Sequence, residues 1–323
     1  MASDFSLKVE TQEKRLDTYL AKKLQISRAL IQEQIASGKI SVNGKVITKA
    51  SSTLHEGDTV TGKTEEEPTD FLQAVEHPLD VIYEDEFLLA INKPQDMVVH
   101  PASAHKGETL VHYLLHHLKN SPSFTETSTV RPGIVHRLDK GTSGIILVAK
   151  NRKTLDSLSQ LFQKREMEKH YEAVIWGVKK GQGTIRSAIG RDRRDRKKIS
   201  SKTVKGRIAV TGWQERRSFA HFTHLELKPQ TGRTHQLRVH LTEAGHPIVG
   251  DPTYGRGTSP KRRQDIAPVL LDFIEKLEHP FLHAKSLSFI HPETGKKIEF
   301  QAPRPPLFET FLKLLNEHDT HAG

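Results

Sequence analysis

The sequence predicts an α+β protein: a small N-terminal α/β domain followed by a larger domain built on a mixed, mostly antiparallel sheet. Strand-like apolar runs and amphipathic helices do not alternate regularly along the chain, which argues against a doubly wound parallel sheet. A polar stretch with one proline, at residues 62–70, is typical of a linker. We therefore expect a first domain at residues 13–63, a linker at 64–74 and a second domain at 75–315.

In the first domain, apolar residues recur at helical spacing within residues 16–24 and again within 30–35, which predicts two helices. Ser27 is placed to cap the second helix, and Gly38 is placed to end it. Asn43-Gly44 lies between two short apolar runs and predicts a two-residue β-hairpin turn.

The second domain mixes strand-like runs with amphipathic helices. The clearest helix is expected at residues 154–165, where Leu155, Leu158, Leu161 and Phe162 lie on one side. Short apolar runs predict the strands, at residues 80–83, 88–91, 134–135, 144–149, 173–175, 221–227 and 297–301.

Composition limits the possible functions. The 323-residue chain has no Cys, which excludes disulfides, cysteine–zinc sites and a thiol nucleophile. The N-terminus lacks the apolar run of a signal peptide, and no stretch of about 18 apolar residues could span a bilayer. We therefore expect a soluble cytoplasmic protein that does not engage a membrane.

Positive charge is concentrated in one segment. The chain carries 49 Lys and Arg against 39 Asp and Glu, a net charge of +10. Between Arg186 and Arg207 there are ten Lys and Arg residues and two acids. Such a run can be a solvated loop, but in a basic protein it favours contact with nucleic-acid phosphates. We expect those contacts from the centre of the segment: Arg193, Arg194, Arg196, Lys197 and Lys198.

The most informative stretch is GIVHRLDKGTSGIILVAK, at residues 133–150. It places His-Arg-Leu-Asp between two apolar strands and follows it with a tight glycine turn. This arrangement would hold Asp139 at the mouth of a cleft. The alternative is an aspartate that caps the turn, with Arg137 as its surface partner.

This stretch resembles the signature of the pseudouridine synthases of the RluA type, in which His-Arg-Leu-Asp carries the nucleophilic aspartate. Further stretches resemble other motifs of that family in the same order: INKPQDMVVHP at 91–101, EKHYEAVIWG at 168–177, TGRTHQLRVHL at 231–241 and GDPTYG at 250–255. The resemblance covers residues 75–303. It implies the pseudouridine synthase fold and the isomerisation of uridines to pseudouridines in RNA without a cofactor.

Residues 15–62 resemble the α-L RNA-binding domain first seen in small-subunit ribosomal protein four. Family members that carry this domain modify large-subunit (23S) ribosomal RNA, so the resemblance implies ribosomal RNA as the partner. We expect a monomer, although the sequence itself does not give the oligomeric state. The form Val-Val-His-Pro at 98–101 resembles the RluD-like branch. The RNA-facing residues that this resemblance implies are Arg15, Lys22, Lys23, Arg28 and Lys39.

The resemblance also assigns roles within the second domain. Asp139 would be the catalytic carboxylate, and Tyr171 would stack on the extruded uracil and relay a proton. Arg233 is the first choice for a guanidinium beside Asp139, and Arg238 is the second. The remaining substrate-binding residues expected are Arg137, His136, His235, Gln236 and Arg238. One residue departs from the family pattern, since Asp96 stands where a glycine is usual.

Other functions compete with this interpretation. The basic charge and the N-terminal domain would equally serve a non-catalytic RNA-binding ribosome-assembly factor. An RNA methyltransferase would need a glycine-rich nucleotide-binding turn, and the turn at residues 141–144 lacks that form. His235, His240 and His246 fit no familiar metal spacing, so we expect no metal.

Overall fold

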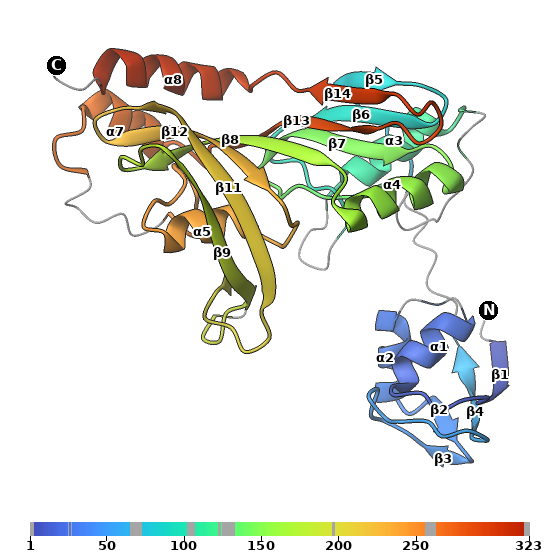
Figure 1. The fold of residues 1–323 in the computed structure, drawn as a ribbon. Coiled ribbons are helices and arrows are strands. Elements are labelled where there is room, and N and C mark those ends of the chain that lie inside the picture. The colour runs from blue at the N-terminus through green and yellow to red at the C-terminus, as the bar shows by residue number, and fades with distance from the viewer. Residues whose placement is uncertain are drawn as a thin grey trace. The chain divides into compact units, whose positions relative to one another are not determined.

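The computed structural model describes residues 3–24, 26, 28–64, 73–101, 107–121, 124, 133–195, 198–255 and 263–319. The chain divides into two compact units, Met1–Gln73 and Ala74–Gly323, whose folds are drawn in Figure 1. Most of the expected linker, at residues 65–72, lies outside the described residues. No helix in the described ranges combines the length and the apolar character that crossing a bilayer requires.

The first unit packs two helices on a four-stranded antiparallel sheet. The helices are α1 (Leu16–Leu24) and α2 (Arg28–Ala36). The strands follow the order β1-β4-β2-β3, with β1 at Ser3–Lys8, β4 at Thr59–Thr64, β2 at Ile40–Val42 and β3 at Lys45–Val46. The turn between β2 and β3 has positive φ at Asn43 (51°) and Gly44 (77°), as the Asn-Gly sequence predicts.

The core of the first unit comes from the helix-spaced apolar residues. Leu16, Leu20, Ile31 and Ile35 are fully buried together with strand residues such as Ile40. The first unit begins before residue 13, the predicted start of the first domain. It includes β1, which pairs along its whole length with β4.

The second unit is built on a ten-stranded sheet with strand order β10-β9-β11-β12-β8-β13-β7-β6-β5, and β14 pairs with β13. All pairs are antiparallel except β13 with β7, which are parallel. The prediction of a mixed, mostly antiparallel sheet is therefore confirmed. The strands are β5 (Val81–Glu84), β6 (Leu88–Lys93), β7 (Ser143–Ala149), β8 (Glu168–Trp176), β9 (Gln182–Arg191), β10 (Ile199–Ser200), β11 (Arg207–Ser218), β12 (Phe222–Pro229), β13 (Leu282–Ile290) and β14 (Lys297–Gln301).

Helices cover this sheet and close its core. They are α3 (Leu110–Leu118), α4 (Arg152–Lys164), α5 (Gln236–Glu243), α7 (Pro268–Glu275) and α8 (Pro306–His318). The helix expected at residues 154–165 is α4, which begins after the side chain of Asn151 caps the backbone N–H of Thr154. Figure 1 shows α8 on one side of the sheet and α4 and α5 on the other.

Two long strands, β9 and β11, form a hairpin that projects from the rest of the sheet (Figure 1). Its tip carries the basic segment that follows Arg191, and the short strand β10 pairs back onto β9. Both β9 and β11 contact α5, and β11 pairs with β12 in the sheet.

Candidate active site

Asp139 lies on a tight turn that two glycines hold against the sheet. The backbone N–H of Thr142 donates to the carbonyl of Asp139 at 3.0 Å, and β7 begins at the next residue. Gly133 and Gly144 both have positive φ. A Cβ atom on either would lie within 2.2 Å of a backbone oxygen on a neighbouring strand. The chain can approach the sheet this closely only with glycine, and the approach fixes the turn that presents Asp139.

Arg238, on α5, holds the carboxylate of Asp139. Its Nη1 donates to Oδ2 of Asp139 at 3.1 Å. Its Nε and Nη2 donate to the two carboxylate oxygens of Asp251 at 2.7 and 2.8 Å. Burial opposes the charge of Arg238, but the hydrogen bonds and charge of Asp251 outweigh burial and raise the pKa of this guanidinium. A permanent cation with a fixed orientation therefore faces the carboxylate.

The side chain of Asp139 is 21% exposed and opens into a cavity of about 580 Å³. Tyr171, on β8, lines the same cavity. Burial, and then the charge of Asp139, raises the pKa of Tyr171, so its hydroxyl stays protonated at neutral pH. A flat ring and a protonated hydroxyl therefore lie within the electrostatic range of the carboxylate.

The cavity wall carries four cations besides Arg137 and Arg238: Arg165, Lys169, Arg207 and Arg233. None of the four forms an ion pair within the described ranges. Burial, and then the charges of Arg207 and Arg165, lowers the pKa of Arg233. Arg165 is also held in the left-handed region (φ 63°) at the end of α4. Cations that lie close together without acidic partners, and that lower the pKa of their neighbours, are typical of an anion-binding site.

The structure reverses the expected order of the two arginines. Arg233 lies in the turn before α5, where its backbone N–H donates to the Gln236 side chain. Arg238 lies within α5 and is the residue that contacts Asp139. Arg238 rather than Arg233 faces Asp139 because the fully buried carboxylate of Asp251 binds and orients Arg238.

Two of the expected substrate-binding residues line the cavity with their polar atoms already engaged. Nε2 of His136 accepts from the backbone N–H of Leu147, and its ring stacks on Phe162. Burial lowers the pKa of His136 to about 3, so the ring is neutral. The Gln236 side chain accepts two hydrogen bonds and donates two others within the protein. Their part in binding substrate stays a prediction.

His235 lies close to the carboxylate, and Arg137 lines the same cavity. Nε2 of His235 is 3.8 Å from Oδ2 of Asp139. Burial, which outweighs the charge of Asp139, lowers the pKa of His235. The side chain of Arg137 is solvent-exposed. Among the described residues, no three His, Cys, Asp or Glu side chains are grouped in a way that could hold a metal ion.

Asp96, which departs from the family pattern, occupies a left-handed position with φ 68°. A glycine would adopt this conformation without strain, and Asp is among the few other residues that tolerate it. The carboxylate of Asp96 pairs with Lys140 at 2.8 Å and with His279 at 3.3 Å. The turn is therefore kept, and its new side chain reaches the residue that follows Asp139.

Lys93 connects the turn that contains Asp96 to the residue that follows Asp139. This fully buried side chain donates to the carbonyls of Pro94, Met97 and Lys140. Burial lowers the pKa of Lys93 to about 7, although the charges of Asp139 and Asp96 oppose that shift. Lys93 lies in the stretch INKPQDMVVHP but was not among the site residues predicted from the sequence.

Three of the proposed RNA-facing residues of the first unit form ion pairs with acidic residues of the same unit. Arg15 and Arg28 both pair with Asp17, whose side chain is fully buried, and remain 42% and 50% exposed. Lys23 lies 3.6 Å from Glu10. Lys22 and Lys39 are exposed.

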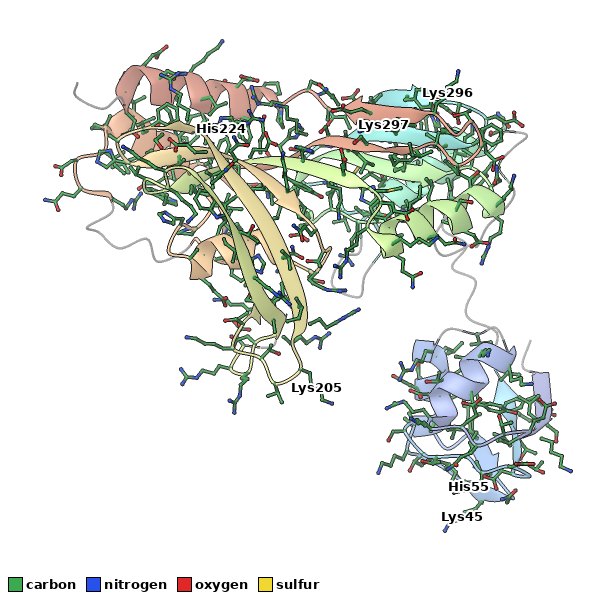
Figure 2. All side chains as sticks on the ribbon, viewed as in Figure 1. Lys45, His55, Lys205, His224, Lys296 and Lys297 are labelled. Carbon is green, nitrogen blue, oxygen red and sulfur yellow. The ribbon has the colours of Figure 1, made fainter. Side chains whose placement is uncertain are left out.

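On the hairpin, Arg193, Arg194 and Lys198 are exposed, whereas Arg196 and Lys197 lie outside the described residues. Asp192 orders this loop, because its carboxylate accepts from the backbone N–H groups of Arg194 and Asp195 and from the Ser200 hydroxyl. Figure 2 shows Lys205 at the far end of the hairpin with its side chain directed outward.

Comparison with known proteins places this geometry in a family. A family model described as RNA pseudouridylate synthase matches residues 87–243, and a model of the S4 domain matches residues 14–60. The chain is 39% identical over 293 residues to ribosomal large subunit pseudouridine synthase D of Vibrio cholerae, covering 90% of this chain and 88% of that protein. It is 38% identical over 304 residues to the uncharacterized RNA pseudouridine synthase YlyB of Bacillus subtilis, covering 94% of both chains.

A solved structure shares the fold of the second unit. Human RNA pseudouridylate synthase domain containing 4 superposes with a TM-score of 0.57 at 24% identity, covering 73% of this chain and 92% of that chain. Identity above one third over nine tenths of the chain is the stronger finding, and the chain belongs to the RNA pseudouridylate synthase family.

Proposed function

We propose that this RNA pseudouridine synthase acts on specific uridines of large-subunit ribosomal RNA and that Asp139 is its catalytic carboxylate. The observation that carries the proposal is the position of Asp139, partly exposed in a 580 Å³ cavity and hydrogen-bonded to a buried arginine. We infer the substrate class, ribosomal RNA of the large subunit, from the names of relatives such as ribosomal large subunit pseudouridine synthase D.

The reaction needs a carboxylate and no redox partner. The bond between the ribose C1′ and N1 of uracil breaks, the ring rotates, and C5 bonds to the same C1′, while C5 loses its hydrogen as a proton and N1 takes up a proton. Asp139 would attack C1′ or stabilise its developing positive charge, as the carboxylates of glycosidases do. A route through a glycal would use the same carboxylate as a base. The bond from Arg238 directs one carboxylate oxygen and leaves the other for the sugar.

The cavity suits an extruded nucleotide. A base inside folded RNA must leave its stack before an enzyme can reach the sugar carbon. Tyr171 offers the uracil a flat face to stack on. The cavity has a volume of about 580 Å³, which is in the usual range for small-molecule sites. The unpaired cations Arg165, Lys169, Arg207 and Arg233 would face the phosphates on either side of the flipped uridine.

Two further surfaces would extend the contact along the RNA. The basic hairpin tip presents Arg193, Arg194 and Lys198 on a loop that Asp192 orders. The S4 domain at residues 14–60 supplies a second basic surface. Sequence-independent phosphate contacts of this kind set the affinity and position the substrate, while the cavity selects the base.

The proposal is tested with ribosomal RNA that carries tritium at C5 of uridine. Release of tritium to water, without added S-adenosylmethionine, is expected from large-subunit RNA and not from small-subunit RNA. Pseudouridine mapping in cells with and without the protein should then identify the lost positions. RNA binding without tritium release would instead identify a non-catalytic assembly factor.

A further inference from the structure

The basic hairpin is docked on the elements that carry the active site. The backbone N–H of Ile199, on β10, donates to the hydroxyl of Tyr254 at 3.0 Å. The backbone N–H of Ser201 donates to Oε1 of Glu243, in the last turn of α5, at 2.8 Å. Ile199 and Tyr254 also pack together against the buried side chain of Val239 on α5. The position of the loop therefore depends on Tyr254 and α5.

The same tyrosine hydroxyl contacts the active site. It lies 2.8 Å from Nδ1 of His235. Because the hydroxyl oxygen already accepts from Ile199, its own proton is free to bind Nδ1. Donation from the hydroxyl to Nδ1 would place the proton of the neutral imidazole on Nε2, the atom that lies 3.8 Å from Oδ2 of Asp139.

Tyr254 also contacts Arg238, the partner of Asp139. The guanidinium lies 5.0 Å from the centre of the tyrosine ring, and Asp251 accepts from the backbone N–H of Tyr254 as well as from Arg238. Tyr254 is not among the residues that line the cavity in the described ranges. Within the described ranges, Tyr254 is linked to the site through His235, Arg238 and Asp251.

We propose that Tyr254 is a positioning residue that couples RNA binding on the basic hairpin to the orientation of Asp139. Phosphates bound at the tip fix the loop, the loop fixes the tyrosine hydroxyl through Ile199, and the hydroxyl fixes His235 against the carboxylate. Hairpin contacts then raise the rate of the bound complex as well as its affinity. This inference rests on the proposed function, since it concerns the same carboxylate.

The first test is Tyr254→Phe in the full-length protein. Phenylalanine keeps the ring beside Arg238 and the packing on Val239 but removes both hydroxyl hydrogen bonds. With saturating enzyme we expect the single-turnover rate to fall about tenfold, the effect of one lost hydrogen bond, while the dissociation constant for RNA changes less than about twofold. Tyr83→Phe is the matched control, because Tyr83 lies on the edge strand β5, its hydroxyl binds Asp85, and neither residue is among those that line the cavity in the described ranges.

The second test is a double-mutant cycle with Arg193→Ser/Arg194→Ser. If the hairpin acts through Tyr254, Tyr254→Phe should cost less than about threefold in that background, because RNA no longer fixes the loop. Glu243→Ala removes the second loop anchor and should lower the single-turnover rate in the same direction, which keeps the inference testable if Tyr254→Phe folds poorly.

Two results would overturn the coupling: a Tyr254→Phe rate within twofold of wild type, or the same tenfold loss in both backgrounds. Either result would leave the proposed function intact if the wild-type protein still forms pseudouridine and Asp139→Asn does not. A wild-type protein that forms no pseudouridine would instead remove the proposed function itself.

Discussion

Replacement of Arg238 by lysine tests whether one guanidinium organises the two carboxylates of the active site. Arg238 is 7% exposed and makes three charge-assisted hydrogen bonds, two to Asp251 and one to Asp139. A lysine ammonium is a point charge on a flexible chain and cannot reproduce a planar fork that spans both acids. Arg238→Lys should therefore leave at least one carboxylate without its partner.

The structure sets the size of the effect. The side chain of Asp251 is fully buried, so losing its partner should lower the free energy of unfolding by about 3–5 kcal/mol. Asp139 would lose the group that orients it. A lost preorganised electrostatic contact in an active site costs about 10²–10³ in rate, and we expect a single-turnover loss of that size.

The assay pairs chemical denaturation with single-turnover pseudouridine formation at saturating enzyme. Arg238→Met/Asp251→Asn is the control, because asparagine carries no buried charge and keeps an acceptor for the backbone N–H groups of Thr253 and Tyr254, while the contact to Asp139 stays lost. This double variant should recover much of the lost stability and remain slow. If Arg238→Lys reacts within threefold of wild type, Arg238 does not orient the catalytic carboxylate.

Three further predictions concern other parts of the chain. Burial lowers the pKa of His136 from 6.5 to about 3, so between these pH values the unfolded chain binds one more proton and stability falls as pH falls. His136→Gln keeps an acceptor and should flatten that slope by about 1.4 kcal/mol per pH unit, measured by denaturation; an unchanged slope would exclude a neutral buried His136. Replacing Arg193 and Arg194 by Ser should reduce the log–log salt dependence of RNA binding by about 0.7–0.9 per lost phosphate contact, and an identical slope would mean that the loop is only solvated. Deleting residues 1–66 should weaken ribosomal RNA binding yet keep turnover on a short RNA; a folded but inactive truncation would contradict an independent first domain.

Local sequence signals predicted the elements that depend on local chemistry. The Asn43-Gly44 hairpin follows from positive φ at both residues, and α4 follows from its apolar stripe, whereas its Asn151 cap was not predicted. The turn that presents Asp139 could be read from the glycines around it, because only glycine fits the close backbone approach at Gly133 and Gly144.

The β9–β11 hairpin could not be predicted in this way. Its strands are ten and twelve residues long, and exposed side chains occur along both. Their only apolar run is the short one at residues 208–210 in β11, so the two strands are defined by their pairing with each other and by the pairing of β11 with β12 rather than by a local signal. The charge of the basic segment predicted an RNA contact, but no local pattern predicted the two strands that carry it.

Long-range contacts explain the errors within the site. Arg233 and Arg238 are five residues apart, and nothing in their own motif decides which one faces Asp139. The choice depends on Asp251, which lies further along the chain and binds Arg238. Tyr254 was missed as a site residue for the same reason, since its partners Ile199 and His235 come from separate elements.

The central claim is tested most directly by Asp139→Asn in single-turnover pseudouridine formation with excess enzyme, which separates chemistry from binding. Asparagine is nearly isosteric and can still accept the hydrogen bond from Arg238, so folding and RNA binding should survive. It cannot form a sugar ester or stabilise positive charge at C1′, and the rate should fall by at least about 10³. A variant that kept a tenth of the wild-type rate would show that Asp139 is not the catalytic carboxylate.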